Sequence, residues 1–125
     1  MSTEYDDLKM YLNKLVKTIE TQSSFDFGNK RILNKTRVDD ILCCIDVNFP
    51  EELKLFKKHG QTDKNVLSYK LYDKLIANIK IKPLFGTSSY AVNYREVVEY
   101  VRLLNESFEK DVLYIKKTYP NILEN

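Results

Sequence analysis

Glycine and proline are scarce in this chain, and their scarcity constrains the fold more than any other feature of the sequence. Only three residues of each type occur among 125. Each β-hairpin usually needs its own turn residues, so a many-stranded sheet would require more of them than the chain contains. A length of 125 residues is the usual size of one domain. The composition therefore favours a single domain built from long helices.

Two long amphipathic helices are predicted, one near each end of the chain, over about 3–22 and about 93–118. Each carries a narrow apolar seam whose members recur at steps of three and four residues, which is the spacing of one helix face. The first seam comprises Leu8, Leu12, Leu15 and Ile19, and the second comprises Val97, Val101, Leu104 and Phe108.

Shorter elements are predicted between these two helices: a polar loop over about 23–35, short helices within about 36–82, and a loop over 83–92. Alternating apolar residues just before Pro83 can also form a brief extended segment, but one such piece does not make a sheet. The predicted fold class is all-α, a small domain of four to five helices with long N- and C-terminal amphipathic helices.

Helix boundaries are predicted from capping residues. Serine, threonine, aspartate and asparagine favour the position before a helix, and glycine favours the position after one. Gly60 is expected to end the helix that "NFPEEL" begins. The predicted N-terminal caps are Thr3 with Asp6, Asn34 or Thr36, Thr62 or Asp63, and Asn93 with Glu96.

The spacing of the glycines excludes several classes of enzyme. Gly28, Gly60 and Gly86 lie far apart. Phosphate-binding loops, dinucleotide-binding turns and the nucleophile elbow of hydrolases each need two or three glycines within a few positions, because the backbone must approach phosphate closely or make a strained turn. We therefore predict no cofactor and no small-molecule substrate.

Cys43, Cys44 and His59 are the only cysteines and the only histidine. They are formally available for a nucleophilic pair or for part of a metal site. Adjacent cysteines lack the C-x-x-C spacing with which a turn grips zinc, and a free cysteine commonly packs as a small apolar residue. His59 follows two lysines at a predicted helix end, where a cation suits the helix dipole. We predict no catalytic residue and no metal ligand.

The middle of the chain is basic. Residues 54–82 carry eight lysines against Asp63 and Asp73, a net charge of +6. Clustered positive charge is sufficient for contact with phosphates, although a solvated lysine-rich helix face gives the same pattern. The candidate nucleic-acid-binding residues are Lys54, Lys57, Lys58 and Lys64.

The two terminal seams admit two interpretations. They can face one another inside the domain, or they can dock helices of a partner protein. On the second interpretation all eight seam residues are candidate partner-binding residues, and the partners are other protein subunits.

No apolar run reaches the eighteen residues of a membrane-spanning helix, and the N-terminus lacks the pattern of a secretory signal. We therefore expect no membrane association. The expected location is the nucleus, with the cytoplasm as the alternative.

As a whole, and most clearly over "NKTRVDDILCCIDVNFPEELKLFKKHG", the chain resembles the small accessory subunits of the fungal Ino-eighty chromatin remodeller that are grouped with its HMG-box subunit. The resemblance implies a non-catalytic nuclear subunit of a module that helps the remodeller to engage DNA and nucleosomes. No residue role is carried over from it.

The function expected from these observations is that of a helical adaptor in a multiprotein complex. A free-standing nucleic-acid-binding module that uses residues 54–82 is the alternative. A small enzyme that depends on Cys43, Cys44 and His59 is the third interpretation.

Overall fold

The computed structural model describes residues 5–25, 30–83 and 88–124 of the chain, and most of them are helical. The prediction of a small, mainly helical domain is confirmed. Its first and last α-helices are the longest described, with 17 and 25 residues. The helices are α1 (Asp6–Gln22), α2 (Lys35–Val47), α3 (Glu51–Lys58), α4 (Ser68–Ile79), α5 (Tyr94–Thr118) and the short 3-10 helix η1 (Pro120–Leu123).

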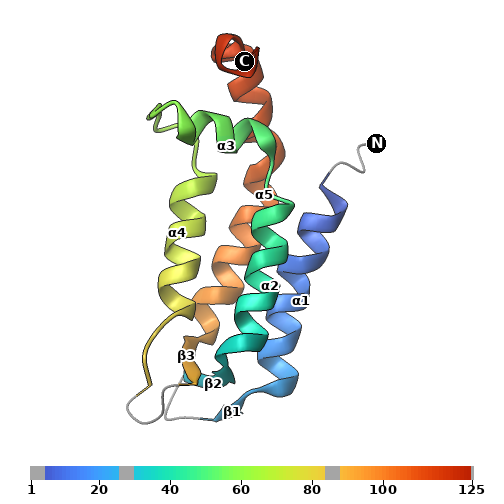
Figure 1. Cartoon of the computed structure of the whole chain (residues 1–125), viewed down its shortest axis with the longest axis vertical. Helices are drawn as coiled ribbons and strands as arrows, with labels where there is room; N and C mark the ends of the chain where they lie inside the picture. Colours follow the sequence, from blue (N-terminus) through green and yellow to red (C-terminus); the bar gives the residue numbers. More distant parts are fainter. Residues whose placement is uncertain (1–4, 26–29, 84–87, 125) are drawn as a thin grey trace.

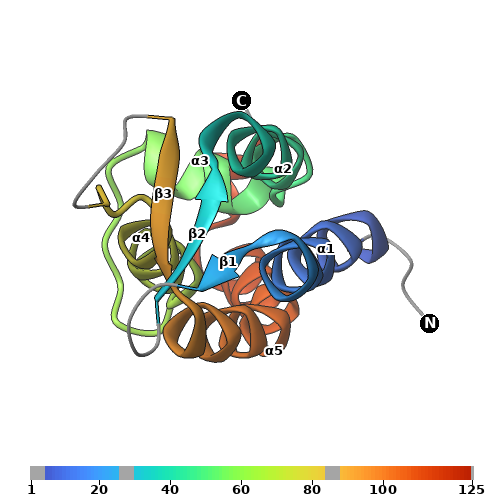
Figure 2. The ribbon, with the colours of Figure 1, turned by 90° about the horizontal axis from the view of Figure 1, so that it is seen from below.

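Four helices run along the length of the molecule, and α3 lies across one end (Figure 1). Seen along this length, α5 has α1 on one side and α4 on the other, and α1 also packs on α2 (Figure 2). Helix α5 therefore packs between α1 and α4, and it also contacts α3.

The core contains both of the predicted seams. Each of the eight seam residues is at most 4% exposed. They face one another and the middle helices, as the intramolecular interpretation expects. The interpretation of Leu8, Leu12, Leu15, Ile19, Val97, Val101, Leu104 and Phe108 as partner-binding residues is therefore wrong for this fold, because the chain's own helices cover them.

A small antiparallel sheet closes the other end of the bundle (Figure 2). Its strands β1 (Ser24–Phe25), β2 (Lys30–Asn34) and β3 (Ser89–Asn93) pair in that order, with Lys30 opposite Asn93 and Asn34 opposite Ser89. The predictions of loops over 23–35 and 83–92 are wrong where these strands form. The strands form because Leu33, Tyr90 and Val92 enter the core and the backbone groups of β2 and β3 pair with each other.

Two predicted helix boundaries are confirmed in detail. The Asn34 side chain accepts a hydrogen bond from the amide of Arg37 (3.2 Å), which caps the start of α2. At the end of α3, Gly60 has a φ of 68°, and its N–H donates to the carbonyl of Lys57. Glycine adopts this left-handed conformation without steric cost, so the chain can turn sharply there.

The predicted cap of α5 is replaced by a contact between distant segments. Helix α5 begins at Tyr94, but Asn93 makes no side-chain capping bond and donates instead to the amide oxygen of Asn78 (2.9 Å). The predicted cap of the first helix at Thr3 lies outside the described residues.

The start of α4 at Thr62 or Asp63 is also wrong, because α4 begins at Ser68. The buried carboxylate of Asp111, on α5, takes the role of the cap. One of its oxygens accepts from the amides of Leu67 (3.0 Å) and Ser68 (2.8 Å) and from the Ser68 hydroxyl (2.5 Å). Donors at a helix start need a partner when they are buried, and here α5 supplies it.

Candidate partner-binding groove between α1 and α5

Helices α1 and α5 run in opposite directions and are joined by polar contacts at two levels. Near the start of α1, the Lys9 ammonium lies 3.3 Å from a carboxylate oxygen of Glu109. Near its end, the Tyr94 hydroxyl donates a hydrogen bond to Glu20. The stretch of α1 between these two contacts is eleven residues, or about 16 Å at 1.5 Å per residue.

A groove of about 560 Å³ lies along these two helices. Three of its nine lining residues are apolar, namely Val16, Val98 and Val101, and Val101 is only 4% exposed. Val98 is 37% exposed, less than Met10 on α1 (51%) and Leu113 on α5 (66%), which lie outside the groove lining. The remaining lining residues are Asn13, Lys17, Glu20, Thr21, Arg102 and Asn105.

The groove arises from a second face on each helix, beside the core seam. On α5 this face is marked by residues spaced three or four positions apart: Val98, then Val101 and Arg102, then Asn105. Val97 and Val98 are consecutive, so they cannot both point into the core: Val97 is buried, and Val98 reaches the surface. This consecutive valine pair is a signal in the sequence for the groove, because a single apolar seam cannot hold both side chains.

Asn105 is the polar residue of the groove that lacks a complete set of partners. Its amide oxygen is buried and has no hydrogen-bond partner in the part of the chain that the structure describes. A buried unsatisfied acceptor costs about 1–3 kcal/mol and is rare in native proteins. Because Lys9 lies opposite Glu109 and Glu20 opposite Tyr94, Asn105 lies at about the level of Asn13 on α1.

The two rims of the groove carry different charges. On α5, the guanidinium of Arg102 bonds to Glu99 and to Glu106 (3.1 Å), and its hydrogen bond to Glu99 lowers the pKa of that carboxyl. These three side chains together carry a net charge of −1. On α1, Lys17 forms no ion pair with any described residue. The α5 rim is therefore weakly acidic, whereas on α1 the charge of Lys17 is offset by that of Glu20.

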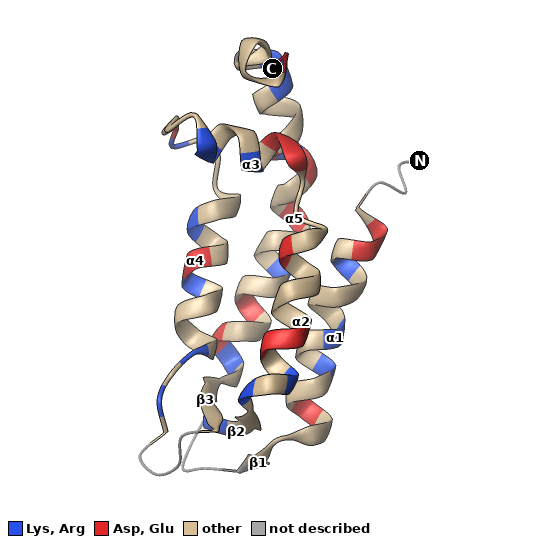
Figure 3. Cartoon of the chain, viewed as in Figure 1, with Lys and Arg blue, Asp and Glu red and all other residues tan. Residues whose placement is uncertain are grey.

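The four candidate nucleic-acid-binding lysines gather at α3 and the turn that follows it. Lys57, Lys58 and Lys64 are exposed, and none forms an ion pair within the described residues. The Lys57 ammonium lies 4.8 Å from the centre of the Tyr69 ring, and Lys54 contacts the carbonyl of Val47 (3.5 Å). Figure 3 shows that α3 is acidic where it begins and basic where it ends.

The thiols and the imidazole belong to different elements. Cys43 is exposed and Cys44 half-buried on α2, whereas His59 is exposed at the end of α3. Within residues 5–25, 30–83 and 88–124, no three histidine, cysteine or acidic side chains come together as a metal site would require. None of the helices in these ranges has the length and apolar content to cross a membrane.

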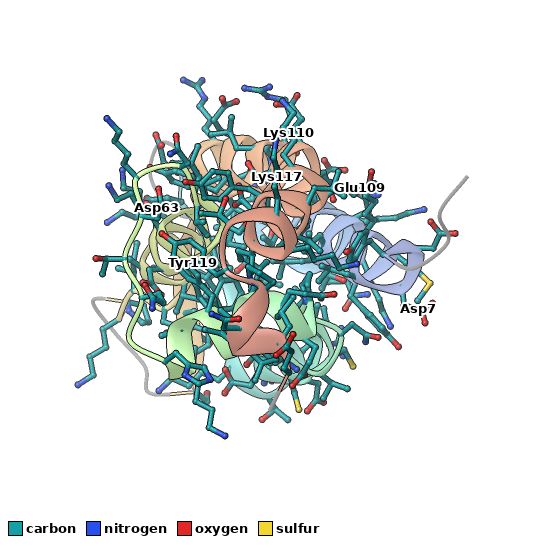
Figure 4. The ribbon with its side chains drawn as sticks, turned by 90° about the horizontal axis from the view of Figure 1, so that it is seen from above. Asp7, Asp63, Glu109, Lys110, Lys117 and Tyr119 are labelled. Carbon is teal, nitrogen blue, oxygen red and sulfur yellow. The ribbon has the colours of Figure 1, made fainter. Side chains whose placement is uncertain are left out.

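Asp63 is a half-buried acidic group that accepts hydrogen bonds from three donors. One of its oxygens accepts from the hydroxyls of Tyr114 (2.6 Å) and Tyr119 (2.7 Å), and the other accepts from the amide of Asn65 (2.9 Å). These bonds, that from Tyr114 first, lower the pKa of Asp63 to about 2. Seen from above, Asp63 and Tyr119 lie on the α4 side of α5 and Glu109 on its α1 side (Figure 4). The cluster ties the end of α5 to the loop before α4.

Comparison of the chain with protein-family models, curated proteins and solved structures finds no match in any of the three. We therefore infer function from the geometry of the chain itself.

Proposed function

We propose that this chain is a non-catalytic helical adaptor subunit of a multiprotein complex. The observation that carries the proposal is the α1–α5 groove, in which Val98 is exposed beside a polar residue without a complete set of partners. The docking surface is this groove and not the two seams, which form the core.

The physical support is the free energy that a partner gains by covering the groove. Removing apolar surface from water contributes about 25 cal/mol per Å², and an amphipathic helix laid in an apolar groove is a common way to remove it. The exposed Val98 would be covered without any change to the core. An adaptor needs such a surface on a rigid scaffold, and α1 and α5 supply one.

The kind of complex is proposed from the resemblance to accessory subunits of the Ino-eighty remodeller. It supports a nuclear, chromatin-remodelling complex, in which the lysines at α3 would lie near DNA or an acidic partner. The resemblance and the groove support different parts of the proposal: the first concerns the kind of complex, and the second concerns how the chain is held in it.

Affinity purification of the tagged chain from its native cells tests the adaptor function. We expect the same proteins to be recovered in fixed proportions, and we expect light scattering of the eluate to give a mass well above that of the 14.8 kDa chain. Recovery of the chain alone, as a monomer, would contradict the proposal.

Direct binding of nucleic acid is the second candidate function. It is favoured by one observation, namely that Lys57, Lys58 and Lys64 are gathered at one end of the molecule without ion-pair partners among the described residues. It predicts DNA binding that weakens steeply with salt, because bound lysines release counterions from the phosphates.

A matched pair of double variants tests this second function. Replacing Lys58 and Lys64 with glutamate is expected to abolish binding to a fluorescent duplex at low salt. Replacing Lys30 and Lys82 with glutamate, far from α3, should leave binding nearly unchanged. Equal effects of the two double variants would show that only net charge matters and would remove the α3 lysines as a site.

A further inference from the structure

We infer that a pocket between the end of α1 and the start of α2 binds the phosphate monoester of a small sugar or polyol. The chain would hold this molecule as a ligand and not convert it. The inference is independent of the proposed adaptor function, because the pocket shares no lining residue with the α1–α5 groove.

The pocket lies where the two helices meet beside the small sheet (Figure 1). Its volume is about 500 Å³. On α1 its lining residues follow one another at steps of four, which places them on one face of the helix: Lys14, Thr18 and Gln22. The remaining lining residues belong to the start of α2 and the residue before it: Asn34, Thr36, Arg37, Asp40 and Ile41.

The start of α2 carries an unusual concentration of positive charge. Helices α1, α3 and α5 each have an acidic residue in the first turn, as the helix dipole favours. The first turn of α2 contains Lys35 and Arg37 and no acidic residue. Both cations add to the positive end of the dipole, so a bound anion would be favoured there.

Hydrogen bonds within the chain leave mainly donors for a ligand in this pocket. The Arg37 guanidinium donates to the side-chain oxygen of Gln22, and the Arg37 backbone amide donates to the side-chain oxygen of Asn34 (3.2 Å). Each of these two amide oxygens therefore has a partner, which leaves the NH2 groups for a ligand. Neither Lys14 nor Arg37 forms an ion pair with a described residue.

Thr18 is the second and independent indication of a ligand. It lines the pocket and is 6% exposed, and its hydroxyl forms no hydrogen bond with any residue that the structure describes. A helical threonine often donates to the carbonyl one turn earlier, as Thr21 does to Lys17 (2.8 Å). Buried polar groups are normally hydrogen-bonded, so the Thr18 hydroxyl is expected to bond to a molecule in the pocket.

A phosphate group fits these donors. A guanidinium can donate to two phosphate oxygens at once, and an ammonium, a hydroxyl and side-chain NH2 groups can reach the others. Side chains and a helix start supply all of these donors, so the site needs none of the closely spaced glycines that a phosphate-binding loop requires.

The rest of the ligand follows from the part of the pocket that phosphate does not fill. A volume of about 500 Å³ is typical of sites for small organic molecules. Ile41 is the one apolar residue among the described lining, which favours a polar ligand. The exposed Asp40 carboxylate would repel phosphate but can accept hydrogen bonds from hydroxyl groups. A sugar phosphate can place its phosphate at Arg37 and its hydroxyls at Asp40.

Titration of the full-length chain with four compounds tests the inference. The compounds are glucose 6-phosphate, inorganic phosphate, glucose and a short phosphoserine peptide, all at one salt concentration. NMR of the isotopically labelled chain locates binding, and calorimetry measures affinity. We expect glucose 6-phosphate to shift the backbone amide signals of Thr18 and Thr36 and to bind about fivefold more tightly than inorganic phosphate, because only the sugar satisfies Asp40. Glucose alone should not bind.

Two matched pairs of variants test the donors. Arg37→Gln should weaken glucose 6-phosphate binding about tenfold, whereas Arg95→Gln, with the same change of charge on α5, should leave it nearly unchanged. The cap of α2 is kept in Arg37→Gln, because Asn34 bonds to the backbone amide at position 37. Thr18→Val, which keeps the size of the side chain, should weaken binding about fivefold, and Thr21→Val should not. Thermal melts check that each variant is folded.

Four results would overturn the inference. They are unshifted Thr18 and Thr36 signals with glucose 6-phosphate, equal effects of Arg37→Gln and Arg95→Gln, unchanged binding in a folded Thr18→Val protein, and tighter binding of the phosphoserine peptide than of the sugar phosphate. The last result would assign the pocket to a phosphorylated protein. The adaptor function would stand in each case, because its own test is the recovery of partners in affinity purification.

Discussion

Helix α5 packs along its length between α1 and α4, and its contacts with these two helices differ. Toward α4, the buried Asp111 carboxylate satisfies three donors at the start of that helix, and Leu75 and Ile79 are fully buried. Toward α1, Val98 remains partly exposed, and the Asn105 amide oxygen is buried without a hydrogen-bond partner in the described structure.

The difference separates stability from binding. Buried polar groups in a finished interface are hydrogen-bonded, as they are between α4 and α5. On the α1–α5 side the core seams are apolar, and the buried Asn105 amide oxygen at the surface groove has no hydrogen-bond partner among the described residues. Both sides contribute to the core, but only the α4 side is complete within the chain, and the α1 side is where we propose that a partner completes the packing.

The largest effect is expected from a charge placed in the shared core. Leu12→Asp and Leu104→Asp should each prevent folding, because a buried unpaired carboxylate costs more than a small domain can lose. Circular dichroism and thermal melts measure this result. If either variant folds normally but loses its partner, the seam residues are surface residues, and the assignment of both seams to the core is wrong.

Loss of the buried cap is expected to have the next largest effect. Asp111→Ala removes the acceptor for the amides of Leu67 and Ser68 and for the Ser68 hydroxyl. We expect a loss of about 2–4 kcal/mol in the free energy of unfolding, measured with urea. Asp111→Asn keeps one acceptor oxygen and should lose less. Equal losses would mean that the hydrogen bonds at α4 contribute little.

A change in the groove should have the opposite sign. Asn105→Leu removes the unsatisfied amide and should leave the free energy of unfolding unchanged or raise it by about 1 kcal/mol. The same variant should weaken recovery of the partner in affinity purification. A destabilised Asn105→Leu protein would show that the amide already has its partner in the free chain.

The smallest effect concerns pH at the outer edge of the α4 side. The pKa of Asp63 is about 2 when folded, against an ordinary value of 3.8. Its ionised form is thus favoured by folding, and this stabilisation is complete above about pH 4 and fades as the pH falls toward 2. The free energy of unfolding, measured with urea at pH 2 to 5, should depend less on pH for Asp63→Asn than for the wild type. Equal pH dependence would show that the hydrogen bonds of Tyr114 and Tyr119 do not favour the ionised form of Asp63.

Helices were predictable from the sequence wherever local signals decide the structure. Apolar spacing located α1 and α5, Asn34 located the start of α2, and Gly60 located the end of α3. These signals connect residues three or four positions apart, so they can be recognised in the sequence without knowledge of the tertiary contacts.

Features that depend on distant partners were not predictable. The cap of α4 comes from Asp111, which lies 43 positions beyond Ser68, and Asn93 bonds to Asn78 instead of to its own helix. The strands are too short for alternation to identify them. The groove was only partly visible: the Val97–Val98 pair indicates two faces, but which face remains open depends on how α1 packs.

Labelling of a thiol in the groove tests the central claim most directly. The Val98→Cys variant is alkylated both as the free chain and within the complex purified from cells, and the exposed Cys43 serves as the internal reference. The account predicts that the complex slows labelling at position 98 at least tenfold relative to Cys43. Equal rates at position 98 in the free chain and in the complex would show that the groove is empty there, which would contradict the account.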